Sequence, residues 1–192
     1  MTSDFLVIGS GVAGLSFAIK AAEHGSVTLI TKNDALNSNT AWAQGGISAV
    51  LPDGLCDRND SIEKHVDDTL DAGAGLCNEK NVRTIIGEGA QTIEELVAWG
   101  TTFDSEGNRY SLGREGGHSE RRILHSKDTT GHEIASSLLE TARNTPRLTI
   151  LADHIAIELI TTGKLGSVTD DRVLGAYALE KETGEVRVLR SN

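Results

Sequence analysis

The feature that most constrains the fold is the hexapeptide GSGVAG at residues 9–14. A short apolar run at residues 4–8 precedes it, a helical pattern over residues 12–24 follows it, and Val27–Ile30 is a second apolar, β-branched run. Glycines spaced G-x-G-x-x-G between a strand and a helix are typical of dinucleotide-binding βαβ units, whereas the bare pattern also occurs in structural turns. Gly25 is positioned to end the helix. The opening therefore predicts a parallel α/β sheet with a dinucleotide site.

Further helices are predicted from start signals and from apolar periodicity. Asp60 followed three residues later by Glu63 is typical of a helix start, as is Thr130 followed by Glu133. Between them, apolar residues recur at helical spacing. The predicted helices cover residues 61–72, residues 79–99 with a break near Gly87 and Gly89, and residues 130–143.

The last part of the chain predicts strands. Leu148–Leu151 is a short apolar strand, and Arg172–Leu179 and Val186–Leu189 flank a KETGE turn, which is typical of a β-hairpin. The predicted fold class is thus α/β, a Rossmann-like parallel sheet with an added antiparallel hairpin or meander. No strand that would return to the parallel sheet follows the hairpin. We therefore expect residues 1–192 to be the N-terminal part of a longer domain, incomplete at its C-terminus.

Composition and charge exclude several functional classes. The formal net charge is −10 and the pI is about 5.0, which argues against nucleic acid as a partner. No apolar run approaches the roughly 20 residues that span a bilayer, and no signal-peptide pattern opens the chain. Cys56 and Cys77 are far apart and form no CxxC motif, so two ordinary thiols are expected, with no metal site. We expect a cytoplasmic protein.

The end of the second predicted strand lacks a residue that NAD-binding units commonly carry. An acidic side chain about 20 residues after the glycine motif usually holds the ribose hydroxyls of NAD. Here the segment is Thr31-Lys32-Asn33, and Asp34 comes later. A lysine is a poor partner for ribose hydroxyls, so the sequence favours a flavin dinucleotide over a nicotinamide one.

Two more glycine-rich loops follow, SNTAWAQGGIS at residues 38–48 and REGGHS at residues 114–119. Paired glycines let a backbone approach a ligand closely. An ordinary surface loop is the simpler interpretation of residues 38–48 taken alone. The second loop places a carboxylate, Glu115, among glycines in a chain that is already acidic, which calls for a specific reason.

Four segments in this order, IGSGVAGL, TAWAQGGISAV, REGGHSERRILH and DTTGHE, resemble the succinate dehydrogenase/fumarate reductase flavoprotein superfamily. The likeness is greatest to its members that oxidise L-aspartate, and it covers nearly the whole chain. It implies non-covalent FAD and the N-terminal part of an FAD-binding domain, without the capping and C-terminal helical domains. It assigns FAD contacts to the three glycines Gly9, Gly11 and Gly14, to Ser10, Val12, Ala13 and Lys32, to Asn39, Thr40, Ala41, Trp42, Ala43, Gln44, Gly45 and Gly46, and to Ile155 and Ala156.

Two positions differ within that superfamily. Members with covalent flavin carry a histidine where this chain has Asn39, so no covalent bond to the flavin is expected. Members that act on succinate carry an apolar residue where this chain has Glu115. L-Aspartate differs from succinate by an ammonium group, and a carboxylate is its natural partner in a dry site. The resemblance thus implies that Glu115 receives the substrate ammonium; the alternative is a surface ion pair with Arg114, Arg121 or Arg122.

The histidines and arginines of this region are less specific. His118 is a candidate catalytic residue that would contact flavin or substrate. His125 and His132 are expected to be structural, since no carboxylate or cysteine completes a metal-ligand pattern with them. Arg121 and Arg122 could neutralise a dicarboxylate or a phosphate, and a solvated role is equally compatible with the sequence.

The resemblance implies an FAD-dependent oxidation of L-aspartate to iminoaspartate, with oxygen or fumarate as the electron acceptor. It also implies a step of de novo NAD biosynthesis ahead of quinolinate and a link to quinolinate synthase. Two alternatives stay open: a soluble fumarate reductase or succinate oxidase, and a non-catalytic FAD-binding fragment. Since the family's remaining dicarboxylate-binding residues lie in later segments, the isolated 192-residue chain is expected to be inactive.

Overall fold

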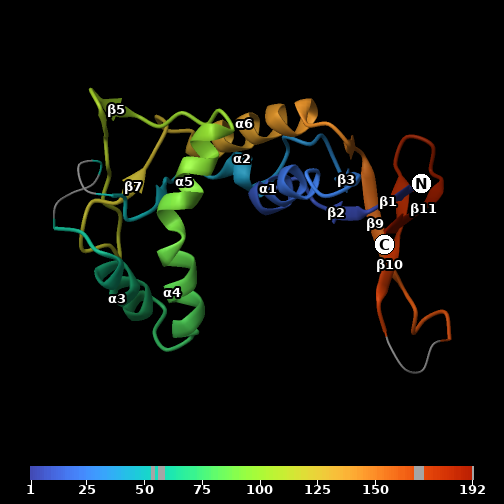
Figure 1. Cartoon of the computed structure of the whole chain (residues 1–192), viewed down its shortest axis with the longest axis horizontal. Coiled ribbons are helices and arrows are strands. Elements are labelled where there is room, and N and C mark those ends of the chain that lie inside the picture. The colour runs from blue at the N-terminus through green and yellow to red at the C-terminus, as the bar shows by residue number, and fades with distance from the viewer. Residues whose placement is uncertain (53–54, 56–58, 167–170, 192) are drawn as a thin grey trace. The chain divides into compact units, whose positions relative to one another are not determined.

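The computed structural model describes residues 1–52, 55, 59–166 and 171–191. The chain forms two compact units, and most of their elements are labelled in Figure 1. Unit 1 contains Met1–Ala41 and Ala135–Asn192, and unit 2 contains Trp42–Ile134. Within the described ranges, no helix has both the length and the apolar character needed to cross a bilayer.

A three-stranded parallel sheet opens unit 1, as predicted. Strand β3 lies between β2 and β8, and all four of its residues are buried. The register aligns Ile8 with Ile30 and Ile30 with Leu151, so the carboxyl ends of the three strands meet at one edge. The elements are β2 (Phe5–Ile8), α1 (Val12–Ala21), β3 (Val27–Ile30), α6 (Thr130–Asn144, which begins in unit 2) and β8 (Leu148–Leu151).

A second sheet in unit 1 confirms the antiparallel hairpin and extends it to a meander. Its order is β1-β11-β10-β9, antiparallel except for the parallel pair of β1 with β11. Ile30 of the first sheet packs with Ala178 and Leu189 of the second in one apolar cluster. The strands are β1 (Thr2–Ser3), β9 (His154–Thr161), β10 (Val173–Glu180) and β11 (Val186–Ser191).

Unit 2 combines helices with two short antiparallel pairs. The predicted break in the long helical segment is confirmed, since α4 ends at Gly87 and α5 begins at Gly89. Cys77 is a free thiol, and Cys56 lies outside the described residues. The elements are α2 (Asn39–Trp42, which begins in unit 1), β4 (Ile47–Ser48), α3 (Ile62–Ala72), α4 (Glu79–Gly87), α5 (Gly89–Ala98), β5 (Ser105–Glu106), β6 (Arg109–Tyr110) and β7 (Ile123–Leu124).

The helix predicted at residues 61–72 is confirmed as α3, but two predicted capping residues, Gly25 and Asp60, were wrong. Helix α1 has its C-cap at Ala22, and Gly25 instead allows a close approach, because a Cβ there would lie 2.8 Å from Asp4 Cβ. Helix α3 is capped by Ser61, whose hydroxyl accepts a hydrogen bond from Lys64 N at 3.2 Å. Asp60 precedes that cap, and its carboxylate accepts a hydrogen bond from Arg122 Nη2 at 2.7 Å.

The start of α6 at Thr130 was predicted correctly, but its two signal residues also serve the preceding loops. Thr130 Oγ1 accepts from Ser126 N at 3.0 Å. Glu133 Oε1 accepts from Thr102 N at 3.0 Å and from Thr102 Oγ1 at 2.7 Å. The side chains that mark a helix start in the sequence therefore also attach loops to that helix.

Candidate functional site

The first glycine loop of unit 1 has the geometry that its spacing requires. Gly9 has φ +108°, a conformation that L side chains rarely adopt, and its N–H donates to Ile30 O at 2.8 Å. A Cβ on Gly14 would overlap the carbonyl oxygen of Gly9. The turn and the close helix–strand contact thus both need glycine, which is the arrangement of dinucleotide-binding loops.

The same loop presents main chain at the N-terminus of α1. Gly11 is the N-cap residue in extended conformation, and Val12 and Ala13 are exposed. Val12 N donates to Thr40 Oγ1 at 3.0 Å, which brings the predicted second loop against the first. A helix N-terminus with accessible amides favours a phosphate group. These residues therefore fit the pyrophosphate of FAD.

Ser10 differs from its neighbours because its side chain is buried. Its hydroxyl donates to Thr31 Oγ1 at 3.0 Å, directly after β3. Ser10 is thus available to a cofactor only through its main chain, and its side chain joins the glycine loop to the segment that carries Lys32.

A lysine from the β10–β11 turn holds the segment after β3. Lys181 Nζ donates to Lys32 O at 3.2 Å, to Asn33 Oδ1 at 3.0 Å and to Asp153 Oδ1 at 3.0 Å. The Lys32 side chain itself is exposed. These contacts fix the backbone of the segment that carries Lys32, a predicted FAD contact.

Two further predicted FAD contacts, Ile155 and Ala156, lie at the start of β9. His154 N donates to Thr31 O at 2.9 Å, so this strand begins beside the end of β3. Ile155 is 38% exposed, and Ala156 is partly buried against the apolar cluster and pairs with Ala178. Their place beside the carboxyl end of β3 is compatible with a cofactor contact through the main chain.

In unit 2 the two other glycine loops meet. Glu115 Oε1 accepts a hydrogen bond from Gly46 N at 3.4 Å, and a Cβ at Gly45 would lie 3.6 Å from the same oxygen. Gly46 also needs its lack of a side chain, because a Cβ there would overlap Ile123 and the Leu124 carbonyl. Trp42, Ala43 and Gln44, which precede them, are exposed.

Residues 115–118 form a tight turn that we call the Glu115 turn. His118 N donates to Glu115 O at 3.2 Å, and Gly117, in the third position, has φ +84°. A positive φ in that position requires glycine or asparagine. Gly113 and Ile123 exchange main-chain hydrogen bonds of 2.8 and 3.1 Å, which close the loop around the turn. The GG pair is therefore explained by backbone geometry, and Glu115 stands at the head of the turn.

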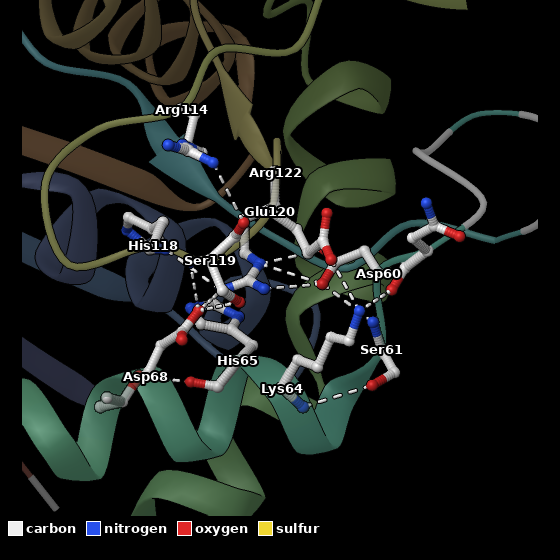
Figure 2. A network of polar contacts seen from close by, with 12 residues as sticks. Asp60, Ser61, Lys64, His65, Asp68, Arg114, His118, Ser119, Glu120 and Arg122 are labelled. Atoms are coloured by element: carbon white, nitrogen blue, oxygen red, sulfur yellow. Dashed lines mark hydrogen bonds and ion pairs between the residues drawn. The ribbon is translucent and has the colours of Figure 1, made fainter.

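The buried centre of unit 2 is Arg122, which is 0% exposed (Figure 2). Its Nε and Nη2 donate to Asp60 at 2.7 to 3.2 Å, and its Nη1 donates to Asp68 Oδ2 at 2.5 Å. Nη1 also lies 3.3 Å from His118 Nδ1. Ser119 donates to Asp68 Oδ2 through both its N and its Oγ, at 2.8 and 2.9 Å. A solvated Arg122, one of the two predicted possibilities, is therefore wrong.

Burial and neighbouring groups shift the pKa values of Asp68 and His65 in this network. Burial alone would raise the pKa of Asp68, but hydrogen bonds from Ser119 and Arg122 outweigh it and lower that pKa to about 2. Burial lowers the pKa of His65, as do the nearby Arg122 and His118. His65 is 6% exposed, its Nδ1 has no hydrogen-bond partner among the described residues, and its ring lies 5.5 Å from that of His118. Within this network the surroundings therefore favour the neutral form of His65 and the ionised form of Asp68.

The remaining predicted polar residues have separate partners. His125 Nδ1 lies 3.0 Å from Asp104 Oδ2, and His132 is exposed in the first turn of α6.

Arg114 and Arg121 line a hollow of about 450 Å³ with Ser119 and Glu120. Across the described part of the chain, none of the ion pairs joins Glu115 to an arginine.

Asp60, His65 and Asp68 were not predicted as members of this network. His65 and Asp68 are three residues apart, so they share one face of α3, and their polarity beside the buried Val66 was an available signal. Nothing local connects them to Arg122, which lies 54 positions after Asp68. No described group of three or more His, Cys, Asp or Glu side chains is arranged to hold a metal ion.

Comparisons with known proteins agree with this geometry. Residues 4–192 match the family model of the FAD binding domain. The chain is 44% identical over 196 residues to L-aspartate oxidase of Pseudomonas aeruginosa, with 98% of this chain and 35% of that protein covered. It is 49% identical over 160 residues to the chloroplastic L-aspartate oxidase of Arabidopsis thaliana, covering 83% of this chain and 24% of that one.

Among solved structures, an E. coli quinol fumarate reductase FrdA mutant matches with a TM-score of 0.89 and 26% identity. The match covers 100% of this chain and 32% of the other. The chain spans about a quarter to a third of the length of the curated relatives it matches.

Proposed function

We propose that this chain, which belongs to the FAD-binding domain family, forms the cofactor-binding part of an enzyme that oxidises L-aspartate to iminoaspartate. The observation that carries the proposal is the identity of 43% to 49% to proteins named L-aspartate oxidase from bacteria and plants. FAD is the cofactor, and its expected contacts in unit 1 are the glycine loop, the N-terminus of α1 and the loop at Lys32. The absence of a histidine at Asn39 supports non-covalent binding.

In this reaction the substrate loses a hydride from its α-carbon and a proton from its ammonium group. When bound, FAD supplies the two-electron oxidant. We assign to Glu115 the binding of the substrate ammonium and the acceptance of its proton. The support is that its carboxylate lies beside Gly45 and Gly46 and has no arginine partner among the described residues. A carboxylate without a cation of its own is free to pair with the substrate.

The same Glu115 argues against the main alternative, a soluble fumarate reductase or succinate oxidase. That reading is favoured by the fold likeness to quinol fumarate reductase. Succinate carries no cation, so a carboxylate at this position would repel the dianion. Discrimination between the two substrates therefore tests the assignment directly.

The test uses the complete enzyme with Glu115→Gln, and with Glu106→Gln, an exposed residue of β5, as the matched control. Loss of one charge-assisted hydrogen bond is worth about 1.5 to 3 kcal/mol, so kcat/KM for L-aspartate should fall roughly 10- to 150-fold. Turnover of succinate, if any, should not fall. Unchanged aspartate turnover in the Glu115→Gln enzyme would refute the ammonium-binding role.

A visible absorption spectrum separates the enzyme from its fragment. We expect the 192-residue chain to bind added FAD and the flavin to stay oxidised when L-aspartate is added without oxygen. The complete enzyme should lose its flavin absorbance on the same addition. Bleaching in the isolated chain would mean that these residues already hold a working site, contrary to our expectation.

Acceptor, pathway and compartment belong to the same proposal. Fumarate or oxygen would reoxidise the flavin, and iminoaspartate would pass to quinolinate synthase in NAD biosynthesis. We propose a cytoplasmic location, although the relatives named chloroplastic show that the compartment differs among organisms. Rates of flavin reoxidation by fumarate and by oxygen in the complete enzyme would rank the two acceptors.

A further inference from the structure

We propose that Arg122 is a positioning residue for the oxidation reaction, because it anchors the Glu115 turn to helix α3. This inference rests on the proposed role of Glu115 as the ammonium-binding residue. Arg122 is fully buried and reaches Asp60 before α3, Asp68 within α3, and His118 at the end of the turn (Figure 2).

Arg122 holds the last residue of the Glu115 turn, His118, and through Asp68 the residue that follows it, Ser119. His118 Nδ1 contacts Arg122 Nη1 at 3.3 Å, and the next residue, Ser119, donates twice to Asp68, which Arg122 also holds. The single bond from His118 N to Glu115 O transmits this fixed position to the head of the turn. The end of the turn is therefore tied to α3 through both a side chain and the main chain.

The turn needs such an anchor because, among the described residues, its other restraints are few: the Gly113–Ile123 main-chain pair at its base and a bond of 3.4 Å from Arg114 Nη1 to Ser119 O. Gly116 and Gly117 separate Glu115 from His118 and contribute no side chains, and residues 114–117 are all exposed. Among the described residues, the Glu115 carboxylate accepts a hydrogen bond from Gly46 N alone, and this bond is long at 3.4 Å. A group that binds a reacting ammonium must be held to within about 0.5 Å, which this bond alone does not supply.

The arrangement requires arginine and not any cation. The planar guanidinium supplies five donors in a fixed fork, and here they serve Asp60, Asp68 and His118 at once. Lysine offers a compact charge that cannot reach all three in this geometry. Since arginine only donates, His118 Nδ1 must accept, and neutral His118 therefore carries its proton on Nε2.

The experiment is a double-mutant cycle in the complete enzyme with Arg122→Lys and Glu115→Gln, assayed by kcat/KM for L-aspartate. Misplacing a reacting group by about 1 Å can cost up to about 100-fold. We expect Arg122→Lys alone to lower kcat/KM about 10-fold or more, but less than about 2-fold when Glu115→Gln is already present. The FAD dissociation constant should be unchanged in both backgrounds. Arg109→Lys, an exposed residue of β6, is the matched control.

Equal effects of Arg122→Lys in both backgrounds would overturn the inference, because the arginine would then act independently of Glu115. The proposed function fails separately, if Glu115→Gln alone leaves aspartate turnover intact. Should Arg122→Lys not fold, His118→Gln replaces it in the same cycle with the same criterion. In addition, ¹⁵N NMR of the histidines should show His118 unprotonated at Nδ1, and a proton there would contradict the contact with Arg122.

Discussion

The loop at Gly9–Gly14 in unit 1 and the Glu115 turn in unit 2 are both glycine-rich, but different forces hold them. The first is fixed by main chain and apolar packing: Gly9 N bonds to Ile30 O, and Leu15 behind it is fully buried. The second is fixed by buried charges, with Arg122 between Asp60 and Asp68.

This difference has consequences for robustness. Apolar burial adds up over many atoms and does not titrate. A buried ion network depends on every partner, because removal of one leaves an uncompensated charge away from water. We therefore expect the cofactor loop to tolerate changes in pH and salt, and the Glu115 turn to be sensitive to single polar substitutions.

The largest effect expected from this comparison is that of Arg122→Met. It leaves two aspartates without their buried partner, which typically costs about 3 to 5 kcal/mol of the free energy of unfolding. Trp42 and Trp99, the two tryptophans of the chain, both lie in unit 2, so urea titration followed by their fluorescence reports this loss. Arg109→Met should change the midpoint little. A small effect of Arg122→Met would mean that the network is not what holds unit 2.

A smaller effect is expected for Gly14→Ala in the cofactor loop. The added methyl group would overlap the Gly9 carbonyl, and overpacking of this kind costs about 1 to 3 kcal/mol. FAD binding, measured by quenching of flavin fluorescence, should weaken with it. Gly87→Ala is the matched control: it meets open space at the end of α4 and should be neutral or stabilising by up to about 1 kcal/mol. If Gly14→Ala and Gly87→Ala lowered the free energy of unfolding equally, overlap with the Gly9 carbonyl would not explain the effect of Gly14→Ala.

The same comparison explains what the sequence could predict. The parallel sheet, the hairpin and the break between α4 and α5 follow from local periodicity, and all three were predicted. Gly9 and Gly14 could be assigned roles because backbone geometry leaves a fixed spacing in the sequence. The role of Glu115 came from resemblance and stays a prediction.

The partners of Arg122 could not be predicted, because the contact joins residues 54 and 62 positions apart. Asp60 matched a capping pattern, and the true cap, Ser61, was its neighbour. Two adjacent arginines, Arg121 and Arg122, looked alike in the sequence, yet one is exposed and the other is fully buried. A charged residue's burial is decided by tertiary packing, which leaves no local pattern.

An acid titration should separate the two regions further. The folded-state pKa of His65 lies below 6.5, so the unfolded chain binds its proton first, and stability should fall as pH drops below about 6.5. The slope approaches about 1.4 kcal/mol per pH unit for one proton. Asp68 has a pKa of about 2 in the folded chain, against the ordinary value of 3.8. The free energy of unfolding should therefore fall again as pH drops from 3.8 towards 2.

Urea midpoints of unit 2 from pH 7.5 to 5, read by tryptophan fluorescence, check the first of these windows. The His65→Gln variant should lose most of the slope between pH 6.5 and 5, whatever its absolute stability. A slope that persists unchanged in that variant would assign the acid sensitivity to another group.

The smallest effect concerns Lys181, a charged side chain in unit 1 that, like Arg122, holds several partners at once. Its ammonium holds Lys32 O, Asn33 and Asp153, but it is 40% exposed, so each bond competes with water. Exposed pairs of this kind are worth about 0.2 to 1 kcal/mol, and Lys181→Met should therefore raise the FAD dissociation constant by at most about 5-fold. Lys164→Met, which removes an exposed pair with Glu158 on the same sheet, is the control and should leave FAD affinity unchanged. A loss of FAD affinity much greater than 5-fold would show that the cofactor loop of unit 1 also depends on a charged side chain. The two loops would then differ only in how strongly they depend on buried or partly buried charges.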